Sequence, residues 1–342
     1  MRLLRQIPKI NNFAVIGKYL ITSSKEDVKI FLENSFELEK HLLFKRFPKI
    51  LHADEKAIFL QEQTNLLRID YTFKEHKLFD INIHNTWMIH YLNDNEILVK
   101  QAVDRDKNYF QLIKYDLNER NVFWEYPCDN YKYWFFDIKY LIVDNNNSKN
   151  IQSIKIETGI CDWVIDINSI FENLYPYDEG ICEIAVKPKV YKNILIVETQ
   201  KTESGVRYLV GIDINSGKLK WHHRGFNNIE LYNGKLYNIE FLGLFRIVNP
   251  DTGEIEYEID LKEEFEKMNI NCEHRFNVTD SHIYFKHAIE GKFGILNLDT
   301  FKIEGVYQLP EGNTMSTDEY PVISGNKLYV RSAPQNNLFI YE

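Results

Sequence analysis

The chain has 342 residues, of which 44% are hydrophobic and 14% aromatic, so it can bury a large core and fold as a globular protein. Its formal net charge of −9 excludes a general nucleic-acid binder, which would carry a basic face, and is compatible with a basic protein partner. No apolar run reaches the roughly 18 residues of a membrane span, and the N-terminus lacks an apolar segment of signal-peptide length. We therefore expect a cytoplasmic protein without membrane contact.

Eight hairpins follow one another along the chain, each with turn residues between two short strands. They read VIGKYLITSS, LHADEKAIFLQE, YLNDNEILVKQ, FFDIKYLIVDN, VYKNILIVETQ, LYNGKLYNIEF, VTDSHIYFKHA and VISGNKLYVRS. The central apolar residue of each second strand marks the period: Leu20, Ile58, Leu98, Leu141, Leu195, Tyr237, Tyr284 and Tyr329. The spacing of about 40–50 residues is typical of a four-stranded propeller blade.

A second phrase follows most hairpins. An apolar strand ends on a polar residue, a turn follows, and an aromatic residue comes eight positions after the polar one. The pairs are Asp116 and Trp124, Lys155 and Trp163, Asp213 and Trp221, and Asn249 and Tyr257. We interpret the turn as the reversal between the third and fourth strands of a blade, and the aromatic as packing over the neighbouring blade. The tryptophans are therefore expected to be structural rather than catalytic.

This pattern resembles the repeat of the quinoprotein-type (PQQ-like) β-propellers, most sharply at residues 116–124, 155–163, 213–221 and 249–257. The Trp-Asp repeat propellers are the nearest alternative, but their Gly-His signature is absent. The quinoprotein-type family includes eight-bladed dehydrogenases and non-catalytic scaffolds. The dehydrogenases typically carry a vicinal cysteine pair near the cofactor, and no adjacent cysteines occur here. The resemblance therefore implies the fold and the non-catalytic branch, without a cofactor.

The two chain ends are expected to close the ring. After the last hairpin the chain offers only NNLFIYE, a third strand without a fourth. The segment RLLRQI, Arg2 to Ile7, precedes the first hairpin and can supply the missing strand, because propellers do not leave such an edge unpaired. We predict an all-β, eight-bladed β-propeller over residues 1–342 as one domain, closed by the N- and C-terminal strands, with seven blades as the alternative.

Four cysteines occur far apart in the chain: Cys128, Cys161, Cys182 and Cys272. They form no CxxC pair, which favours reduced and mostly buried thiols over a disulfide framework or a zinc site. Cys272 is near three histidines in the sequence, His274, His282 and His287. His282 and His287 are five residues apart on an expected strand and so face opposite sides. We therefore expect no metal site.

Three long connections are expected on one face of the propeller: Asn168–Glu183, Asp260–Arg275 and Pro310–Tyr320. Loops of this length are uncommon unless they are functional or disordered. Their aromatic and acidic side chains suit a basic protein partner. The expected partner-binding residues are Tyr175, Tyr177, Asp178, Glu179, Glu263, Glu264, Phe265, Met268, Asp318 and Glu319. The alternative is that the aromatics hold the loop to its blade and the charges are only solvated.

The chain contains no Walker loop, GxGxxG, GxSxG or HExxH motif. We therefore expect a non-enzymatic protein-binding scaffold that is a monomer apart from its partner. A specific version is a bacterial immunity protein that neutralises a toxin. The alternative is a small-ligand-binding or enzymatic propeller that uses the central channel. The innermost strands, such as NFAVI and NIELY, have few carboxylates, which argues against that alternative.

Overall fold

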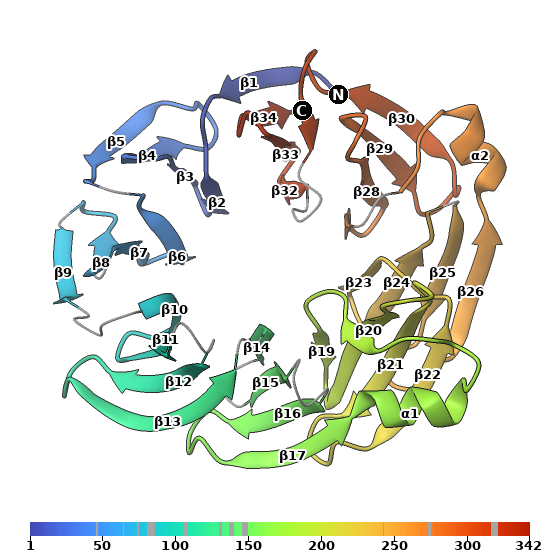
Figure 1. Cartoon of the computed structure of the whole chain (residues 1–342). Coiled ribbons are helices and arrows are strands. Elements are labelled where there is room, and N and C mark those ends of the chain that lie inside the picture. Colours follow the sequence, from blue (N-terminus) through green and yellow to red (C-terminus); the bar gives the residue numbers. More distant parts are fainter. Residues whose placement is uncertain are drawn as a thin grey trace.

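The computed structural model describes the chain except residues 46, 64, 74, 81–85, 105–108, 130–131, 137–139, 146–149, 242, 273–274 and 316–320. Its strands surround a central axis, and in each sheet made of consecutive strands the first strand is nearest the axis and the last is at the periphery (Figure 1). This arrangement is a β-propeller, so the predicted all-β propeller class is confirmed.

The described strands pair into eight antiparallel sheets, seven of which consist of strands that are consecutive in the sequence. The first of these sheets contains β2 (Asn12–Ile16), β3 (Tyr19–Ser23), β4 (Asp27–Leu32) and β5 (Leu38–Leu43), and the second contains β6 (Lys49–Ala53), β7 (Ala57–Glu62), β8 (Asn65–Asp70) and β9 (Glu75–Asp80). The third contains β10 (Thr86–Asn93), β11 (Glu96–Asp104), β12 (Tyr109–Asp116) and β13 (Asn121–Asp129). The fourth contains β14 (Lys132–Phe136), β15 (Tyr140–Asn145), β16 (Asn150–Lys155) and β17 (Cys161–Asp166).

The other three contain β18 (Cys182–Ile184), β19 (Lys189–Tyr191), β20 (Ile194–Lys201), β21 (Arg207–Asp213) and β22 (Leu219–Arg224); β23 (Ile229–Tyr232), β24 (Lys235–Ile239), β25 (Leu244–Val248) and β26 (Ile255–Asp260); and β27 (Phe276–Val278), β28 (His282–His287), β29 (Lys292–Asn297) and β30 (Ile303–Gln308). In the first of these, β18 and β19 both pair with β20 and together form the innermost edge.

The eighth sheet joins the two ends of the chain. It contains β31 (Thr314–Met315), β32 (Val322–Ser324), β33 (Lys327–Ala333), β34 (Leu338–Tyr341) and, as its outer strand, β1 (Leu3–Ile7). β1 pairs antiparallel with β34, with Leu3 opposite Tyr341 and Ile7 opposite Leu338. The predicted closure by the N-terminal segment is therefore confirmed, and the two ends lie side by side in Figure 1.

The middle strands form the core. In β20 the consecutive residues Leu195, Ile196 and Val197 are all fully buried, because both faces of each sheet pack against neighbouring sheets. A short continuous apolar run is the pattern of a strand buried on both faces. Leu20, Ile58, Leu98, Leu195 and Tyr329, which mark the period in the sequence, are also buried.

The three tryptophans of the repeat join neighbouring sheets. The Nε1 atoms of Trp124, Trp163 and Trp221 each donate a hydrogen bond to a backbone carbonyl of the following sheet or its turn. The acceptors and distances are Ile156 (2.8 Å), Ile214 (2.7 Å) and Pro250 (3.1 Å). Each indole also packs on the turn of the following sheet, so the prediction that these aromatics pack over the neighbouring blade is confirmed.

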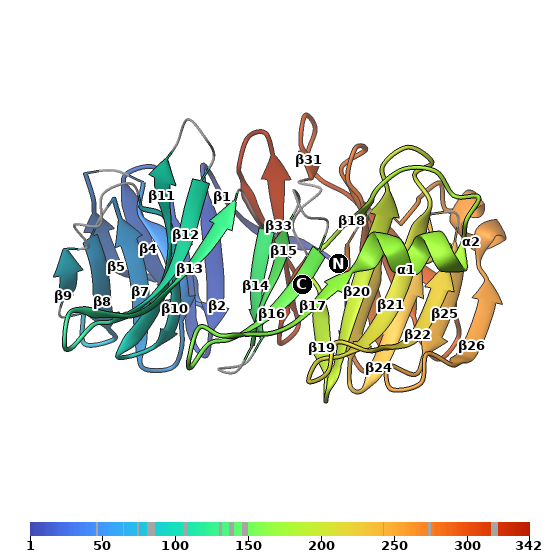
Figure 2. The same ribbon diagram turned by 60° about the horizontal axis from the view of Figure 1, so that its bottom comes forward.

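Two helices occur in the described part of the chain, α1 (Ile167–Leu174) and α2 (Lys262–Lys267). Each follows the outer strand of one sheet and precedes the innermost strand of the next, and both lie at the periphery of the ring (Figures 1 and 2). Among the described residues, no helix combines the length and the apolar character that crossing a membrane requires.

Candidate functional site

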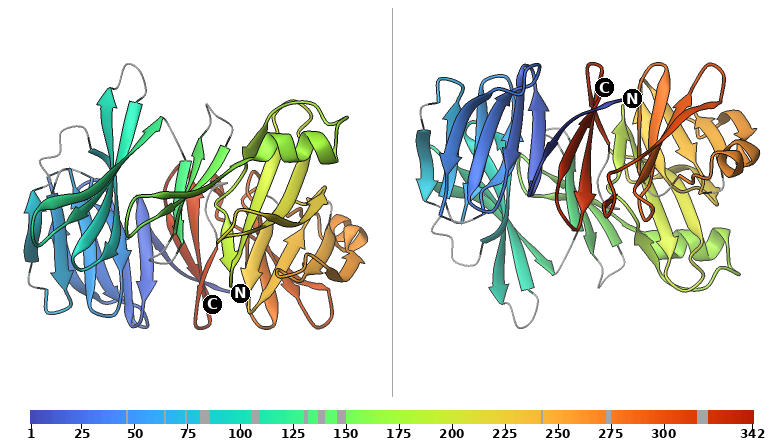
Figure 3. Two further views of the ribbon diagram at one scale, coloured as in Figure 1. Left: turned by 90° about the horizontal axis from the view of Figure 1, so that it is seen from below. Right: turned by 90° about the horizontal axis from the view of Figure 1, so that it is seen from above.

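One face of the ring carries the long connections, and we call it the long-loop face. It consists of the loops between successive sheets and the loops from the second to the third strand of each sheet. These two kinds of loop contact one another: Thr202 N donates to Ile181 O at 2.9 Å, and Lys292 Nζ donates to Asn269 O at 3.2 Å. Seen edge-on, α1 lies at this face and the two chain ends lie at the opposite one (Figure 3).

The first long connection begins with α1, whose start is determined by Asp166. The Asp166 carboxylate accepts hydrogen bonds from Asn168 N (2.9 Å) and Ser169 N (3.2 Å), two of the amides that a helix start leaves unpaired. Phe171 then turns inward and is fully buried. The sequence predicted a loop here, and the short amphipathic helix with its N-cap is an addition to that prediction.

Tyr175 anchors this connection to the sheet beneath it. Its ring lies 5.1 Å from the ring of Tyr208, between centroids, and its hydroxyl forms a 2.9 Å hydrogen bond with His222 Nδ1. Tyr175 is therefore half-buried and engaged within the chain. For Tyr175 the contacts agree with the alternative interpretation of the sequence, in which the aromatic residues hold the loop to its blade.

Asp178 is also engaged within the chain. Arg224 Nε and Nη2, on the outer strand β22, donate to its two carboxylate oxygens at 2.8 Å each, and the Tyr208 hydroxyl donates as well. The bonds from Arg224, followed by the one from Tyr208, lower the pKa of Asp178 to about 2. Such a two-point ion pair fixes geometry. Asp178 therefore fastens the loop, and its carboxylate is not a free charge for a partner.

Tyr177 and Glu179 flank Asp178 and point to solvent. Tyr177 is 94% exposed, which no other large apolar or aromatic side chain among the described residues exceeds. Glu179 is exposed, and so are Glu172 and Glu183 in the same connection. The anchored Tyr175 and Asp178 thus hold a loop that presents an aromatic ring beside three carboxylates.

The second long connection contains α2, and here the structure corrects one prediction. Phe265 is only 2% exposed and packs against Phe285, with ring centroids 5.2 Å apart. Met268 packs partly buried against the same core. Phe265 is buried because α2 is a single amphipathic turn whose apolar side must cover the sheet edge. It therefore cannot offer contact area to a partner.

The charges of α2 are partly neutralised within the helix. Glu264 lies 3.9 Å from Lys267, and Glu266 lies 3.8 Å from Lys262. Glu263 is exposed. In the third long connection, Asp318 and Glu319 lie outside the described residues. Glu179 in the first connection and Glu263 in the second are therefore the exposed carboxylates among the described predicted positions.

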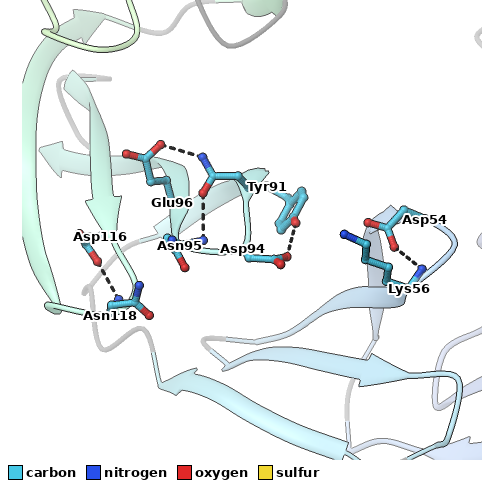
Figure 4. A pocket seen from close by; sticks show the side chains of 9 residues that line it. Asp54, Lys56, Tyr91, Asp94, Asn95, Glu96, Asp116 and Asn118 are labelled. Atoms are coloured by element: carbon cyan, nitrogen blue, oxygen red, sulfur yellow. Dashed lines mark hydrogen bonds between the residues drawn. The ribbon is translucent and has the colours of Figure 1, made fainter.

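A cavity of about 630 Å³ opens on the opposite, short-turn face, between two neighbouring sheets (Figure 4). Its lining residues are Asp54, Lys56, Tyr91, Asn93, Asp94, Asn95, Glu96, Asp116 and Asn118. The carboxylates already stabilise turns: Asp54 accepts from Lys56 N at 2.7 Å, and Asp116 accepts from Asn118 N at 2.7 Å. Asp94 accepts from the Tyr91 hydroxyl at 2.7 Å. These residues have structural roles that their hairpin-turn positions explain.

The described residues contain no group of three or more His, Cys, Asp or Glu side chains that could hold a metal ion. Of the histidines near Cys272 in the sequence, His282 lies 3.0 Å from Glu304 and His287 lies 3.9 Å from Glu290. His274 lies outside the described residues. Cys272 is buried and, like Cys161 and Cys182, does not form a disulfide.

A second cavity, of about 440 Å³, lies between the innermost strands β19, β23 and β27. Its lining residues are Lys187, Pro188, Lys189, Glu230, Leu231, Tyr232, Arg275, Asn277 and Val278. Lys189 Nζ lies 3.0 Å from each carboxylate oxygen of Glu230. The sequence analysis did not identify this cavity, because its cations come from two different sheets and form no local motif.

No protein-family model and no curated protein matches the sequence. Solved structures match the fold. BamB from Moraxella catarrhalis aligns with a TM-score of 0.64 at 13% identity, over 100% of this chain and 99% of that one. The computationally designed Ika8 protein aligns at 0.66 and 10% identity, over 98% and 96%. The dihydro-heme d1 dehydrogenase NirN aligns at 0.55 and 10% identity, over 88% and 66%.

At these identities the likeness shows the fold alone. A designed protein and a dehydrogenase share this fold, so the fold does not select a function. Function has to be argued from the surface and the cavities of this chain.

Proposed function

We propose that the chain is a non-enzymatic, protein-binding propeller whose partner docks on the long-loop face. The observation that carries this proposal is the distribution of exposed apolar side chains. Away from the outer strands, the exposed large apolar residues in the described part of the chain all lie on the long-loop face: Phe47, Val103, Leu174, Tyr177, Ile181, Phe241 and Ile289. The remaining ones lie in the outer strands or directly beside them.

Single exposed apolar side chains are common and need no explanation. Here they lie in the connections of several different sheets or at the ends of the elements that lead into them. Ile289 is 75% exposed at the turn between β28 and β29, and Phe47 is 62% exposed before β6. Because these side chains are exposed, none of them is part of the buried core. Aromatic residues at such positions supply the anchors of protein interfaces.

Exposed charge on the same face suggests the kind of partner. Glu172, Glu179 and Glu183 are exposed in one connection, while the neighbouring Asp178 is neutralised by Arg224. An acidic rim around apolar anchors complements a basic protein surface and speeds its association. A cytoplasmic bacterial immunity protein that covers a basic toxin is a specific version of this proposal and rests on the same acidic rim.

A further part of the proposal is that the chain is related to the quinoprotein-type propellers, and the contacts between neighbouring sheets support it. Trp124, Trp163 and Trp221 each pack on the turn glycine of the following sheet, namely Gly159, Gly217 and Gly253. This is the docking role that the resemblance implies for the repeat tryptophan. It concerns the scaffold and implies no redox chemistry.

The proposal is tested by affinity capture from the native organism with three baits. The first is the wild-type chain, and the second carries Phe47→Ser, Tyr177→Ser, Phe241→Ser and Ile289→Ser. The control carries Leu38→Ser, Val122→Ser and Ile255→Ser, which change exposed apolar residues of the outer strands. We expect one protein to be enriched by the wild type and the control and lost with the second bait. Enrichment that survives in the second bait and disappears in the control contradicts the proposal.

A further inference from the structure

The wall of the central channel concentrates positive charge in an acidic protein. The cavity between β19, β23 and β27 is lined by three cations, Lys187, Lys189 and Arg275, and by one anion, Glu230. Glu230 is paired with Lys189 at 3.0 Å. Cations therefore outnumber anions by three to one among the lining residues, although the whole chain has a formal net charge of −9. Charge of one sign in a concave site raises the local concentration of ions of the opposite sign.

A second observation places more positive charge in the channel. His90 is on the innermost strand β10, and its pKa is lowered to about 4 by burial and then by Lys49 and Lys187. Lys49 begins the innermost strand β6. The fields of Lys49 and Lys187 therefore overlap at His90, although the three residues come from three different sheets. Neither lysine has an ion-pair partner within the described residues.

The same cavity offers apolar surface beside its cations. Pro188 and Val278 are buried in its wall, and Leu231 and Tyr232 are half-buried. The Tyr232 hydroxyl donates to Asp280 at 3.0 Å, which fixes the position of the ring. A ligand here therefore meets a fixed aromatic ring and aliphatic side chains on one side and ammonium and guanidinium groups on the other. A volume of about 440 Å³ is in the range of small-molecule sites.

We propose that this cavity binds a small organic anion. Its carboxylate or phosphate group is held by Lys187 and Arg275, and its apolar body lies against Leu231, Tyr232 and Val278. Arginine and lysine are the side chains that bind both kinds of anion, so the two share one recognition chemistry. The site is distinct from the long-loop contacts proposed above and does not depend on a protein partner.

The experiment uses a matched set of probes on the full-length protein: 2-naphthyl phosphate, 2-naphthoate, the neutral 2-naphthol and inorganic phosphate. Binding is measured by isothermal titration calorimetry at neutral pH, at low and at high ionic strength. The variants are Lys187→Glu and Arg275→Gln. The control is Lys218→Glu, which makes the same charge change at an exposed position in the turn between β21 and β22. Thermal melts confirm that each variant is folded.

We expect one or both naphthyl anions to bind at least about tenfold more tightly than 2-naphthol and than inorganic phosphate, because charged hydrogen bonds and the apolar body both contribute. Lys187→Glu and Arg275→Gln should each lower the affinity for the anion by about tenfold or more, while Lys218→Glu should have wild-type affinity. The tighter of the two anions identifies the preferred headgroup. High ionic strength should weaken anion binding.

Three results overturn the proposal. The first is that no probe binds to the folded wild-type protein. The second is that 2-naphthol binds as tightly as the anions, which would show that charge does not contribute, or that inorganic phosphate does, which would show that the apolar body does not contribute. The third is that folded Lys187→Glu and Arg275→Gln retain wild-type affinity, or that Lys218→Glu loses as much as they do.

Discussion

The indole ring of Trp163 covers Gly217 so closely that a Cβ atom on Gly217 would lie 2.9 Å from the ring carbons. Gly217 also has a φ of +69°, a conformation that residues with a side chain rarely adopt. The turn therefore needs glycine for two reasons, its backbone conformation and the approach of the tryptophan from the preceding sheet. In the turn between β29 and β30, Phe301 is at the position that corresponds to this glycine. There the contact between neighbouring sheets is a ring stack of Phe301 with Tyr257, with centroids 4.7 Å apart.

Replacing Gly217 by alanine should destabilise the fold by more than the backbone cost alone. We expect a loss of about 2–4 kcal/mol in the free energy of unfolding, from the left-handed backbone and from the displaced indole. Gly325→Ala is the matched control, because Gly325 has a φ of +57° and a Cβ atom added there would meet nothing within 4 Å. Urea unfolding of both variants measures the difference. Equal losses at the two positions would show that the contact with Trp163 is unimportant.

Truncation of Trp163 to alanine should cost about 3–5 kcal/mol, the usual range for a buried tryptophan. Trp163→Phe keeps most of the packing and loses the bond to Ile214, so about 0.5–1.5 kcal/mol is expected for the hydrogen bond. Chemical unfolding gives both values. In a double-mutant cycle, Gly217→Ala should cost less in the Trp163→Ala background, because the two residues are in contact.

Removal of residues 1–8 should destabilise the whole ring, because it removes β1 from the eighth sheet. The ends are joined by two backbone hydrogen bonds, from Arg2 N to Glu342 O at 2.6 Å and from Glu342 N to Arg2 O at 3.0 Å. We expect a clearly lower melting temperature for the truncated chain. The control is a permuted chain that links residue 342 to residue 1 and opens at the turn between Asn233 and Gly234. It should melt near the wild-type temperature, and a truncated chain that does the same would contradict ring closure.

The propeller could be predicted from the sequence because its repeat is defined by local sequence features. Turn residues between short apolar runs recur through the whole chain, and local turns determine antiparallel hairpins. The pairing of β1 with β34 could also be predicted, since each end offers a strand without a partner. The docking of Trp124, Trp163 and Trp221 followed from the position of each aromatic after its turn.

The details of the site could not be predicted in the same way. Asp178 was expected to be a free acidic charge, but the ring places Arg224, 46 residues later in the chain, directly beside it. Phe265 was expected to supply contact area to a partner, yet the short helix α2 directs it inward. Lys187 and Arg275 reach one cavity from different sheets. Each of these is a contact between distant segments that no local pattern contains.

The ion pair of Asp178 predicts a pH dependence of stability. Its folded-state pKa of about 2 is below the usual 3.8, so the pair stabilises the fold above about pH 4. This contribution is lost as the pH falls from about 4 to 2. The difference in stability between the wild type and Asp178→Asn should therefore be constant near neutral pH and shrink in that range. Urea titrations at several pH values test this. The control Glu179→Gln changes an exposed carboxylate and should leave the profile unchanged.

The kinetics of partner binding should separate two roles on the long-loop face. Tyr177 is a 94% exposed ring, so Tyr177→Ala should remove an anchor and raise the dissociation rate. Glu179 is an exposed rim charge, so Glu179→Lys should lower the association rate at low salt and have little effect at high salt. Surface plasmon resonance with the captured partner measures both rates. Glu55→Lys is the charge-matched control, because Glu55 is exposed in the β6–β7 turn of the opposite face. If Glu55→Lys slows association while both loop variants bind like the wild type, the partner docks on the short-turn face instead.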